Sequence, residues 1–280
     1  MDELKDVAFV VHPRRGDARI CADRAEAFFR DAGIRVLYPR EWERAGRFGM
    51  VISFGGDGTL LLGAGEAVAS GCPLLGINLG TVGFLTEGDP EQLIPLMEKV
   101  LAGDYHIENR GLLSVRVNGE EETWPALNDA VVTRGGFARL IQVETRINWE
   151  HWDTFTADGV IAATPTGSTG YSLSAGGPVL APGVEGIVIT PVCAHSLRQC
   201  PCVVPASSAV RFHLKKDREQ RAELQIDGRS RRMLNAGDSV TVTGASESLR
   251  LVRIGEYRFF DVMKQKFLAW SRPGKEEEQP

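Results

Sequence analysis

The chain has 280 residues, of which 43% are hydrophobic and 25% charged, so it has the composition of a soluble globular protein with one large or two ordinary domains. Its formal net charge of −5 gives no support for a nucleic-acid or anionic-membrane surface. No apolar run approaches the roughly 20 residues that span a bilayer, and the first residues are charged, so we expect no membrane segment and no signal peptide.

The cysteine content favours a reduced, cytoplasmic protein, because five is an odd number in a chain of this size. Cys193, His195, Cys200 and Cys202 lie close together in the sequence. Their spacing matches no paired C-x-x-C zinc motif, and we therefore predict no metal ligands in the protein.

Residues 1–109 alternate between apolar strands and amphipathic helices. The expected elements are strands at residues 7–11, 34–38, 50–54 and 74–78, and helices at residues 17–32, 59–70 and 90–102. This alternation predicts an α/β domain with a parallel, Rossmann-like sheet that is covered by helices on both faces.

From about residue 110 the pattern changes to short strands separated by turn signals such as Asn118-Gly119 and Asp227-Gly228. The expected strands are residues 112–117, 121–133, 140–147, 152–156, 186–192, 203–204, 209–214, 223–226, 239–242 and 249–254. We predict a mostly β domain of the sandwich type at residues 110–258. The amphipathic segment that begins at Phe259 should pack back on the first domain, so that residues 259–280 belong with residues 1–109.

A glycine-rich turn at residues 53–59 joins a predicted strand to a predicted helix. Gly55, Gly56 and Gly58 let a ligand approach the main chain, and N–H groups at the start of a helix bind anions. Asp57 would repel phosphate, so its carboxylate suits a hydroxyl group or a metal ion better. Taken alone, the turn fits equally well a phosphoryl-transfer site and a plain joint in which Asp57 caps the helix. Its place at the carboxyl end of a strand favours the first interpretation.

A second unusual stretch, residues 158–178, is rich in glycine, proline and hydroxyl side chains, and we predict a long loop there. Long loops inside compact domains are uncommon unless they are functional. Short hydroxyl groups suit hydrogen bonds to a polar planar ligand, and Tyr171 offers an aromatic face. One such loop in each domain predicts a small-molecule site between the domains.

Four motifs together resemble the NAD kinase family over most of the chain: Gly-Gly-Asp-Gly-Thr at residues 55–59, Leu127-Asn128-Asp129, Asp158-Gly159, and the run from Thr164 to Pro178. The resemblance implies transfer of a phosphoryl group to the 2′-hydroxyl of the adenosine ribose of NAD, which gives NADP. It implies ATP or inorganic polyphosphate as the donor, a divalent metal ion such as Mg²⁺ carried with the donor, and a homodimer or homotetramer in which a neighbour completes the site.

The resemblance also assigns roles to individual residues. Asp57 matches the proton acceptor, and the main chain of the glycine turn would bind phosphate. The implied NAD-binding residues are Asp57, Gly58, Asn128, Asp129, Arg139, Asp158, Thr169, Gly170, Tyr171, Ser172, Leu173 and Ser174, and the phosphate-binding residues are Gly55, Gly56 and Thr59.

At four positions the chain departs from the pattern of the family. Gly170 replaces the more usual Ala, and Asp129 stands where many relatives have Glu. Leu62 occupies a position that is often basic, and Arg229 one where Gln is common. The last two departures affect the expected phosphate and partner-subunit contacts rather than the reaction.

Two other functions fit parts of the sequence. A lipid-type kinase would share the Gly-Gly-Asp-Gly-Thr run, but it would have no use for the hydroxyl-rich stretch that follows Thr164. A non-catalytic NAD-binding regulator would need no base at Asp57.

Overall fold

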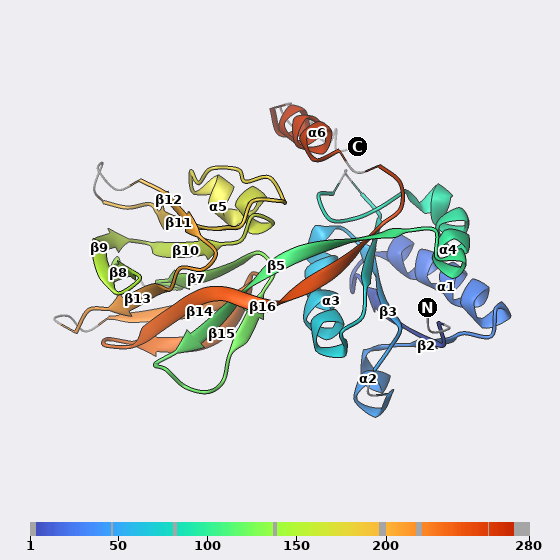
Figure 1. The fold of residues 1–280 in the computed structure, drawn as a ribbon, viewed down its shortest axis with the longest axis horizontal. Helices are drawn as coiled ribbons and strands as arrows, with labels where there is room; N and C mark the ends of the chain where they lie inside the picture. The colour runs from blue at the N-terminus through green and yellow to red at the C-terminus, as the bar shows by residue number, and fades with distance from the viewer. Residues whose placement is uncertain are drawn as a thin grey trace, which may run out of the picture. The chain divides into compact units, whose positions relative to one another are not determined.

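A computed structural model describes residues 4–45, 47–80, 83–136, 139–195, 200–216, 220–256 and 258–271. The chain forms two compact units (Figure 1). The first unit comprises Met1–Asn109 and Arg250–Pro280, and the second comprises Arg110–Leu249. The chain therefore passes from the first unit to the second within strand β5 (His106–Val117) and returns within strand β16 (Ser239–Arg253).

The first unit has a parallel sheet, as the alternating pattern predicts. Four strands pair in the order β2-β1-β3-β4, and the end of β16 joins β4 in parallel through Leu251 and Leu74. Its elements are β1 (Asp6–Val11), α1 (Gly16–Asp31), β2 (Arg35–Leu37), α2 (Pro39–Ala45), β3 (Met50–Gly55), α3 (Asp57–Ser70), β4 (Leu74–Asn78), a 3-10 turn (Pro90–Gln92), α4 (Leu93–Ala102) and α6 (Phe259–Ser271).

Successive strand residues point to opposite sides of the sheet, and both sides of these strands are apolar. Helices therefore cover both faces. Phe9 and Ile52 share one core cluster with the apolar residues of α1 and α4. On the other face lies α3, where Gly63 lets the helix approach the sheet closely: a Cβ on Gly63 would lie 3.0 Å from Val10 and 3.1 Å from Val51. Figure 1 shows α3 on the side of the strands opposite to α1 and α4.

The second unit is mostly β and contains two sheets. One sheet has the strand order β12-β11-β10-β7-β14-β15, and the other includes β16, β13, β8, β9, β5 and β6. The further bounds are β6 (Trp124–Ala126), β7 (Asp129–Thr133), β8 (Ile141–Ile147), β9 (Glu150–Ala157), β10 (Gly159–Ala163), a 3-10 turn (Gly167–Thr169), α5 (Tyr171–Ser174), β11 (Gly186–Val192), β12 (Cys202–Pro205), β13 (Val210–Leu214), β14 (Arg221–Ile226) and β15 (Arg229–Asn235).

One apolar core joins the inner faces of these two sheets. Val132 and Val160 from the first sheet share a cluster with Val143, Phe155 and Phe212 from the second. The predicted combination of an α/β domain with a mostly β domain of sandwich type is thus confirmed.

Several predicted element boundaries are wrong. Residues 159–163 are not loop but strand β10, which is buried along its whole length between β7 and β11. A strand buried on both faces shows no alternation of polar and apolar residues, which is why the pattern did not reveal it. The expected strand at residues 121–133 is interrupted at residues 127–128, whereas the two expected strands at residues 239–242 and 249–254 are one continuous strand.

Helix α6 contacts the loop that follows β4. The Phe259 and Phe84 ring centroids lie 5.9 Å apart, and the Lys266 ammonium lies 5.4 Å from the Phe84 ring centroid. Phe260 and Leu268 are exposed on the same helix. None of the described helices combines the length and the apolar character that crossing a membrane requires.

Candidate functional site

Asp57 is the first residue of α3, and Gly56 alone separates it from the carboxyl end of β3. Its carboxylate does not cap its own helix, because the N-cap position is Gly56 and has no side-chain hydrogen bond. Instead, Oδ2 accepts a hydrogen bond from the main-chain N–H of Phe84 (2.9 Å), and Oδ1 accepts one from that of Leu85 (3.1 Å). The interpretation of Asp57 as a simple helix cap is therefore wrong.

The three glycines of the turn serve different purposes. A Cβ on Gly55 would lie 2.2 Å from Thr59 Oγ1, so this position needs glycine to admit the Thr59 side chain. Gly56 and Gly58 have nothing within 4 Å of an added Cβ, so the space beside Asp57 is open. Thr59 is only 3% exposed, and its hydroxyl has no hydrogen-bond partner within the described ranges. The main chain of the turn at Gly56 and Gly58 is therefore open to a ligand, and Thr59 stays a predicted phosphate contact.

A buried arginine fixes the loop that holds Asp57. Arg253 is fully buried, and it donates hydrogen bonds to Glu108 Oε2 (2.7 Å), Glu87 Oε1 (2.7 Å) and the Phe84 carbonyl (3.1 Å). Burial alone would lower the pKa of the guanidinium, but the contacts with Glu108 and Glu87 outweigh it and the pKa is raised. Arg253 thus stays charged and connects β5 and β16 to the peptide unit that contacts Asp57.

The Leu127-Asn128-Asp129 segment lies in the second unit. It contacts the turn between β14 and β15 on one side and the loop after β10 on the other. The carboxylate of Asp227 accepts the main-chain N–H groups of all three residues, over 2.9, 2.7 and 3.1 Å. On the other side, Thr164 donates from its hydroxyl to the Leu127 carbonyl (2.6 Å) and from its main-chain N–H to the Asn128 carbonyl (2.9 Å).

Asn128 and Asp129 both have side chains suited to a ligand. Asn128 Oδ1 is buried and has no hydrogen-bond partner among the described residues. Buried polar atoms ordinarily have a partner, so this oxygen is available to accept a hydrogen bond from a ligand. Asp129 is 5% exposed, and burial followed by the charge of Asp227 raises its pKa to about 7. A carboxyl group with this pKa exchanges between donor and acceptor forms near neutral pH.

The hydroxyl-rich run divides into side chains that hold the loop and side chains that face solvent. The Ser172 hydroxyl is buried against Thr190 Oγ1 (2.8 Å), and Thr169 donates to the Thr166 carbonyl (3.1 Å). Tyr171 is 45% exposed, Leu173 is half-buried and Ser174 is exposed. A Cβ on Gly170 would lie 3.7 Å from Asn128 Nδ2, which places this residue beside Asn128.

Two predicted nucleotide contacts lie elsewhere in the second unit. Asp158 precedes β10 and forms an ion pair with Arg134, whereas Asp129 pairs with Ala163 at the other end of β10. Five residues of strand separate these ends, or about 16 Å. Arg139 is exposed. Within one chain, Asp158 is therefore not brought together with Asn128 and Asp129.

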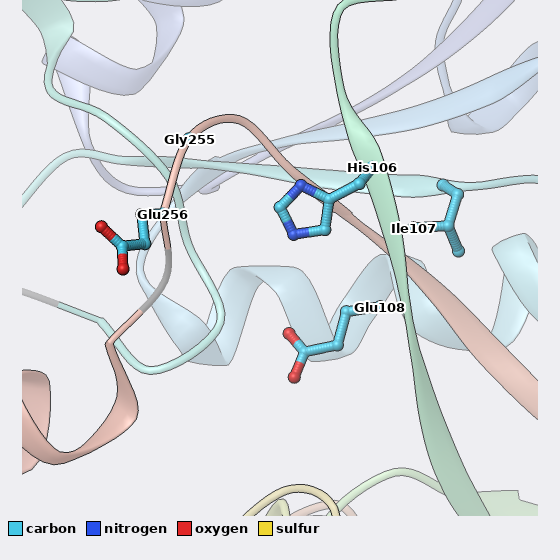
Figure 2. A pocket seen from close by; sticks show the side chains of 5 residues that line it. All are labelled: His106, Ile107, Glu108, Gly255 and Glu256. Atoms are coloured by element: carbon cyan, nitrogen blue, oxygen red, sulfur yellow. The ribbon is translucent and has the colours of Figure 1, made fainter.

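A hollow of about 610 Å³ in the first unit is lined by His106, Ile107, Glu108, Gly255 and Glu256 (Figure 2). Glu108 is also a partner of Arg253. None of the predicted site residues lines this hollow, so it is separate from the candidate site. In the part of the chain that the structure describes, no three His, Cys, Asp or Glu side chains gather as metal ligands would.

Comparison with known proteins assigns the chain to a family. Residues 41–105 match the ATP-NAD kinase N-terminal domain, and residues 127–254 match the ATP-NAD kinase C-terminal domain. The NAD kinase of Heliobacterium modesticaldum is 42% identical over 231 residues, which cover 81% of each chain. That of Desulforamulus reducens is 34% identical over 284 residues, which cover 95% of this chain and 98% of the relative.

Two solved structures share the fold. An NAD kinase from Archaeoglobus fulgidus in complex with ATP has a TM-score of 0.72 at 26% identity, covering 93% of this chain and 97% of that one. Yeast NADH kinase complexed with NADH has a TM-score of 0.85 at 24% identity, covering 99% of this chain and 91% of that one. Since both domains match one family, and relatives are similar over most of their length, this chain belongs to the NAD kinase family.

Proposed function

We propose that this protein is an NAD kinase, which transfers the γ-phosphoryl group of ATP to the 2′-hydroxyl of the adenosine ribose of NAD and forms NADP. The observation that carries the proposal is the carboxylate of Asp57, which is fixed at the start of α3 by two main-chain N–H groups and lies beside an open glycine turn. Membership of the NAD kinase family supplies the substrate class.

Asp57 acts as the proton acceptor. A ribose hydroxyl is a poor nucleophile near neutral pH, and a carboxylate at hydrogen-bond distance orients it and takes its proton as the new P–O bond forms. A carboxylate has about four lone-pair positions, and Phe84 and Leu85 occupy two of them. The remaining positions accept the substrate hydroxyl. Base catalysis of this kind contributes about 10²–10⁴-fold to the rate.

The glycine turn holds the phosphate donor. The main-chain N–H groups of Gly56 and Gly58, at the start of a 14-residue helix, favour an anion, and no side chain at either position obstructs it. Phosphoryl transfer depends mainly on positioning and charge stabilisation. A Mg²⁺ ion carried with the donor would be bound by phosphate oxygens and water, and it would help to neutralise the charge of the transferring phosphoryl group. Inorganic polyphosphate would present the same chemical groups.

The second unit binds the nucleoside portion of NAD. Asn128 offers a buried acceptor, and Asp129 offers a carboxyl group whose pKa is about 7. Tyr171 provides an exposed aromatic face, and the Thr169–Ser174 segment supplies main-chain groups around it. Ser172 supports the segment through Thr190 rather than by touching the ligand.

We further propose a cytoplasmic homodimer or homotetramer in which a partner copy supplies Asp158 to the site. The separation of about 16 Å along β10 between Asp158 and the Asp129 end of that strand supports this assignment.

A coupled assay for NADP formation tests the proposal. Purified protein is incubated with NAD and Mg²⁺, first with ATP and then with polyphosphate, and the NADP formed is measured with an NADP-dependent dehydrogenase. We expect NADP with ATP. Binding of NAD without product would identify a non-catalytic regulator instead, and phosphorylation of diacylglycerol but not NAD would identify a lipid-type kinase.

A further inference from the structure

Asp227 occupies the tip of the β14–β15 hairpin. Asp227 and Gly228 have φ values of 49° and 73°, which is the two-residue turn geometry that Asp-Gly favours. The main-chain N–H of Asp227 donates to the Asp129 carbonyl over 3.0 Å, so the tip is fastened to the start of β7. This turn directs the Asp227 carboxylate at the segment that precedes β7.

The carboxylate of Asp227 accepts hydrogen bonds from three consecutive main-chain N–H groups. Oδ2 accepts from Leu127 N (2.9 Å), and Oδ1 accepts from Asn128 N (2.7 Å) and Asp129 N (3.1 Å). Successive main-chain N–H groups that point at one anion form an anion-binding site known as a nest. The anion here is part of the protein.

The opposite edge of the same segment is fixed by the loop after β10. Thr164 occupies the carbonyls of Leu127 and Asn128, and a Cβ on Gly167 would lie 2.0 Å from the Asn128 carbonyl oxygen. The main chain of residues 127–129 is therefore held on both edges. In this position the side-chain amide of Asn128 lies beside Gly170, since a Cβ on Gly170 would be 3.7 Å from Asn128 Nδ2.

We propose that Asp227 is a positioning residue for nucleotide binding, because it fixes the main chain of residues 127–129 and thereby sets the directions of the Asn128 and Asp129 side chains. The proposal rests on the proposed function, in which these two side chains bind the nucleoside portion of NAD.

The Asp227 carboxylate also affects the pKa of Asp129. Burial and then the charge of Asp227 raise the pKa of Asp129 to about 7. Among the described residues, Tyr171 also interacts with Asp129, and its pKa is raised first by burial and then by Cys193, Asp158 and Asp129. Arg231 acts on Asp227 in the opposite sense and lowers its pKa. The Asp129 carboxyl group therefore holds its proton to higher pH than an exposed aspartate, and it loses this proton as the pH rises.

The test compares Asp227→Asn with Asp238→Asn. Asp238 is also a turn aspartate of the second unit, and it accepts hydrogen bonds from Asn118 Nδ2 and the Asn235 main chain, each over 2.8 Å. Amide hydrogen exchange of Leu127, Asn128 and Asp129 should become about tenfold faster or more in Asp227→Asn, while the amides of residues 131–133 keep their rates. Asp238→Asn should leave all of these amides unchanged.

Kinetics and titration supply the functional readout. In Asp227→Asn we expect the KM for NAD to rise about tenfold while the KM for ATP stays within about twofold. The inflection of NAD affinity against pH should move to lower pH by about half a unit or more, because the neighbouring charge is lost. Asp227→Glu keeps the charge, so its inflection should stay near the wild-type pH although its KM for NAD rises.

Unchanged exchange at residues 127–129 in both Asp227 variants would overturn the proposal, and so would equal effects of Asp227→Asn and Asp238→Asn on the KM for NAD. If wild-type protein neither binds NAD nor forms NADP, the proposed function is wrong, and the exchange rates alone decide whether Asp227 fixes the segment. If Asp227→Asn does not fold, the exchange rates of residues 127–129 in Asp227→Glu decide the question: faster exchange supports the proposal, and unchanged exchange overturns it.

Discussion

The main-chain N–H of Phe84 donates a hydrogen bond to Asp57 Oδ2 over 2.9 Å, although the two residues are 27 positions apart in the chain. The neighbouring N–H of Leu85 occupies the other carboxylate oxygen over 3.1 Å. A Cβ on Gly83 would lie 2.5 Å from Asp57 Oδ1, so the loop approaches the carboxylate closely from one side. The orientation of the proposed base is thus set by the loop after β4 rather than by its own helix.

Replacing Asp57 by Asn should abolish most turnover while NAD still binds. The amide cannot accept the proton of the ribose hydroxyl, so kcat should fall by about 10²–10⁴-fold. Steady-state kinetics and equilibrium binding of NAD measure the two quantities separately. Asp261→Asn is the control, since Asp261 also lies in the first turn of a helix, α6, and should leave kcat unchanged. Near-normal NADP formation by Asp57→Asn would rule out Asp57 as the base.

Replacing Arg253 by Met should destabilise the protein strongly. Arg253 is fully buried and forms ion pairs with Glu87 and Glu108, and its replacement removes the ion pairs that it forms with these two carboxylates. Loss of one partner of a buried ion pair costs about 3–5 kcal/mol. The free energy of unfolding is measured by urea denaturation followed by tryptophan fluorescence.

The matched control for Arg253→Met is Arg232→Met, which removes another arginine with two hydrogen bonds to a carboxylate, that of Glu120. This pair is partly exposed, so its loss should cost less than about 1 kcal/mol. Equal losses in the two variants would show that the Arg253 contacts do not stabilise the first unit. Among Arg253 variants that remain folded, kcat should also fall, because the Phe84 carbonyl loses its donor.

The sequence predicts the parts of the site that depend on local pattern. The strand–turn–helix at residues 50–70 shows apolar runs on either side of three glycines, and the structure places Asp57 at the start of that helix. Asp57 itself stands out because a carboxylate is unexpected in a phosphate-binding turn.

The supporting contacts could not be predicted, because they carry no signature in the sequence. Phe84 and Leu85 act through main-chain N–H groups, which every residue except proline possesses. Arg253 lies at the end of a strand, where an arginine is ordinarily exposed. In the sequence, Asp227 indicates only an Asp-Gly turn. Its three hydrogen-bond partners lie about 100 positions earlier in the chain, so no local pattern reveals them.

Replacing Gly167 by Ala should weaken NAD binding. The new Cβ would lie 2.0 Å from the Asn128 carbonyl oxygen and 2.7 Å from its Cα, and neither is the end of a flexible side chain. The segment that carries Asn128 must therefore move, and we expect the KM for NAD to rise about tenfold and the free energy of unfolding to fall by about 1–3 kcal/mol. In Gly183→Ala the Cβ has nothing within 4 Å, so both quantities should stay at wild-type values. Identical kinetics for the two variants would contradict the close packing at Gly167.

Replacing Asp129 by Asn should change how stability depends on pH. The pKa of Asp129 is about 7 in the folded protein and about 3.9 in an unfolded chain. The folded state therefore holds the proton more tightly, so the stabilisation is complete below about pH 4 and is lost as the pH rises through about 7. From pH 5 to pH 8 this group lowers the free energy of unfolding of the wild-type protein by about 2–3 kcal/mol.

In Asp129→Asn this loss is absent, because the amide does not titrate. The difference in unfolding free energy, variant minus wild type, should therefore increase by about 2–3 kcal/mol between pH 5 and pH 8. Urea denaturation of both proteins at a series of pH values measures this difference, in which the titration of carboxylates that do not interact with Asp129 cancels. A difference that stays constant with pH would mean that Asp129 is already ionised at pH 5, and that burial and the charge of Asp227 do not raise its pKa.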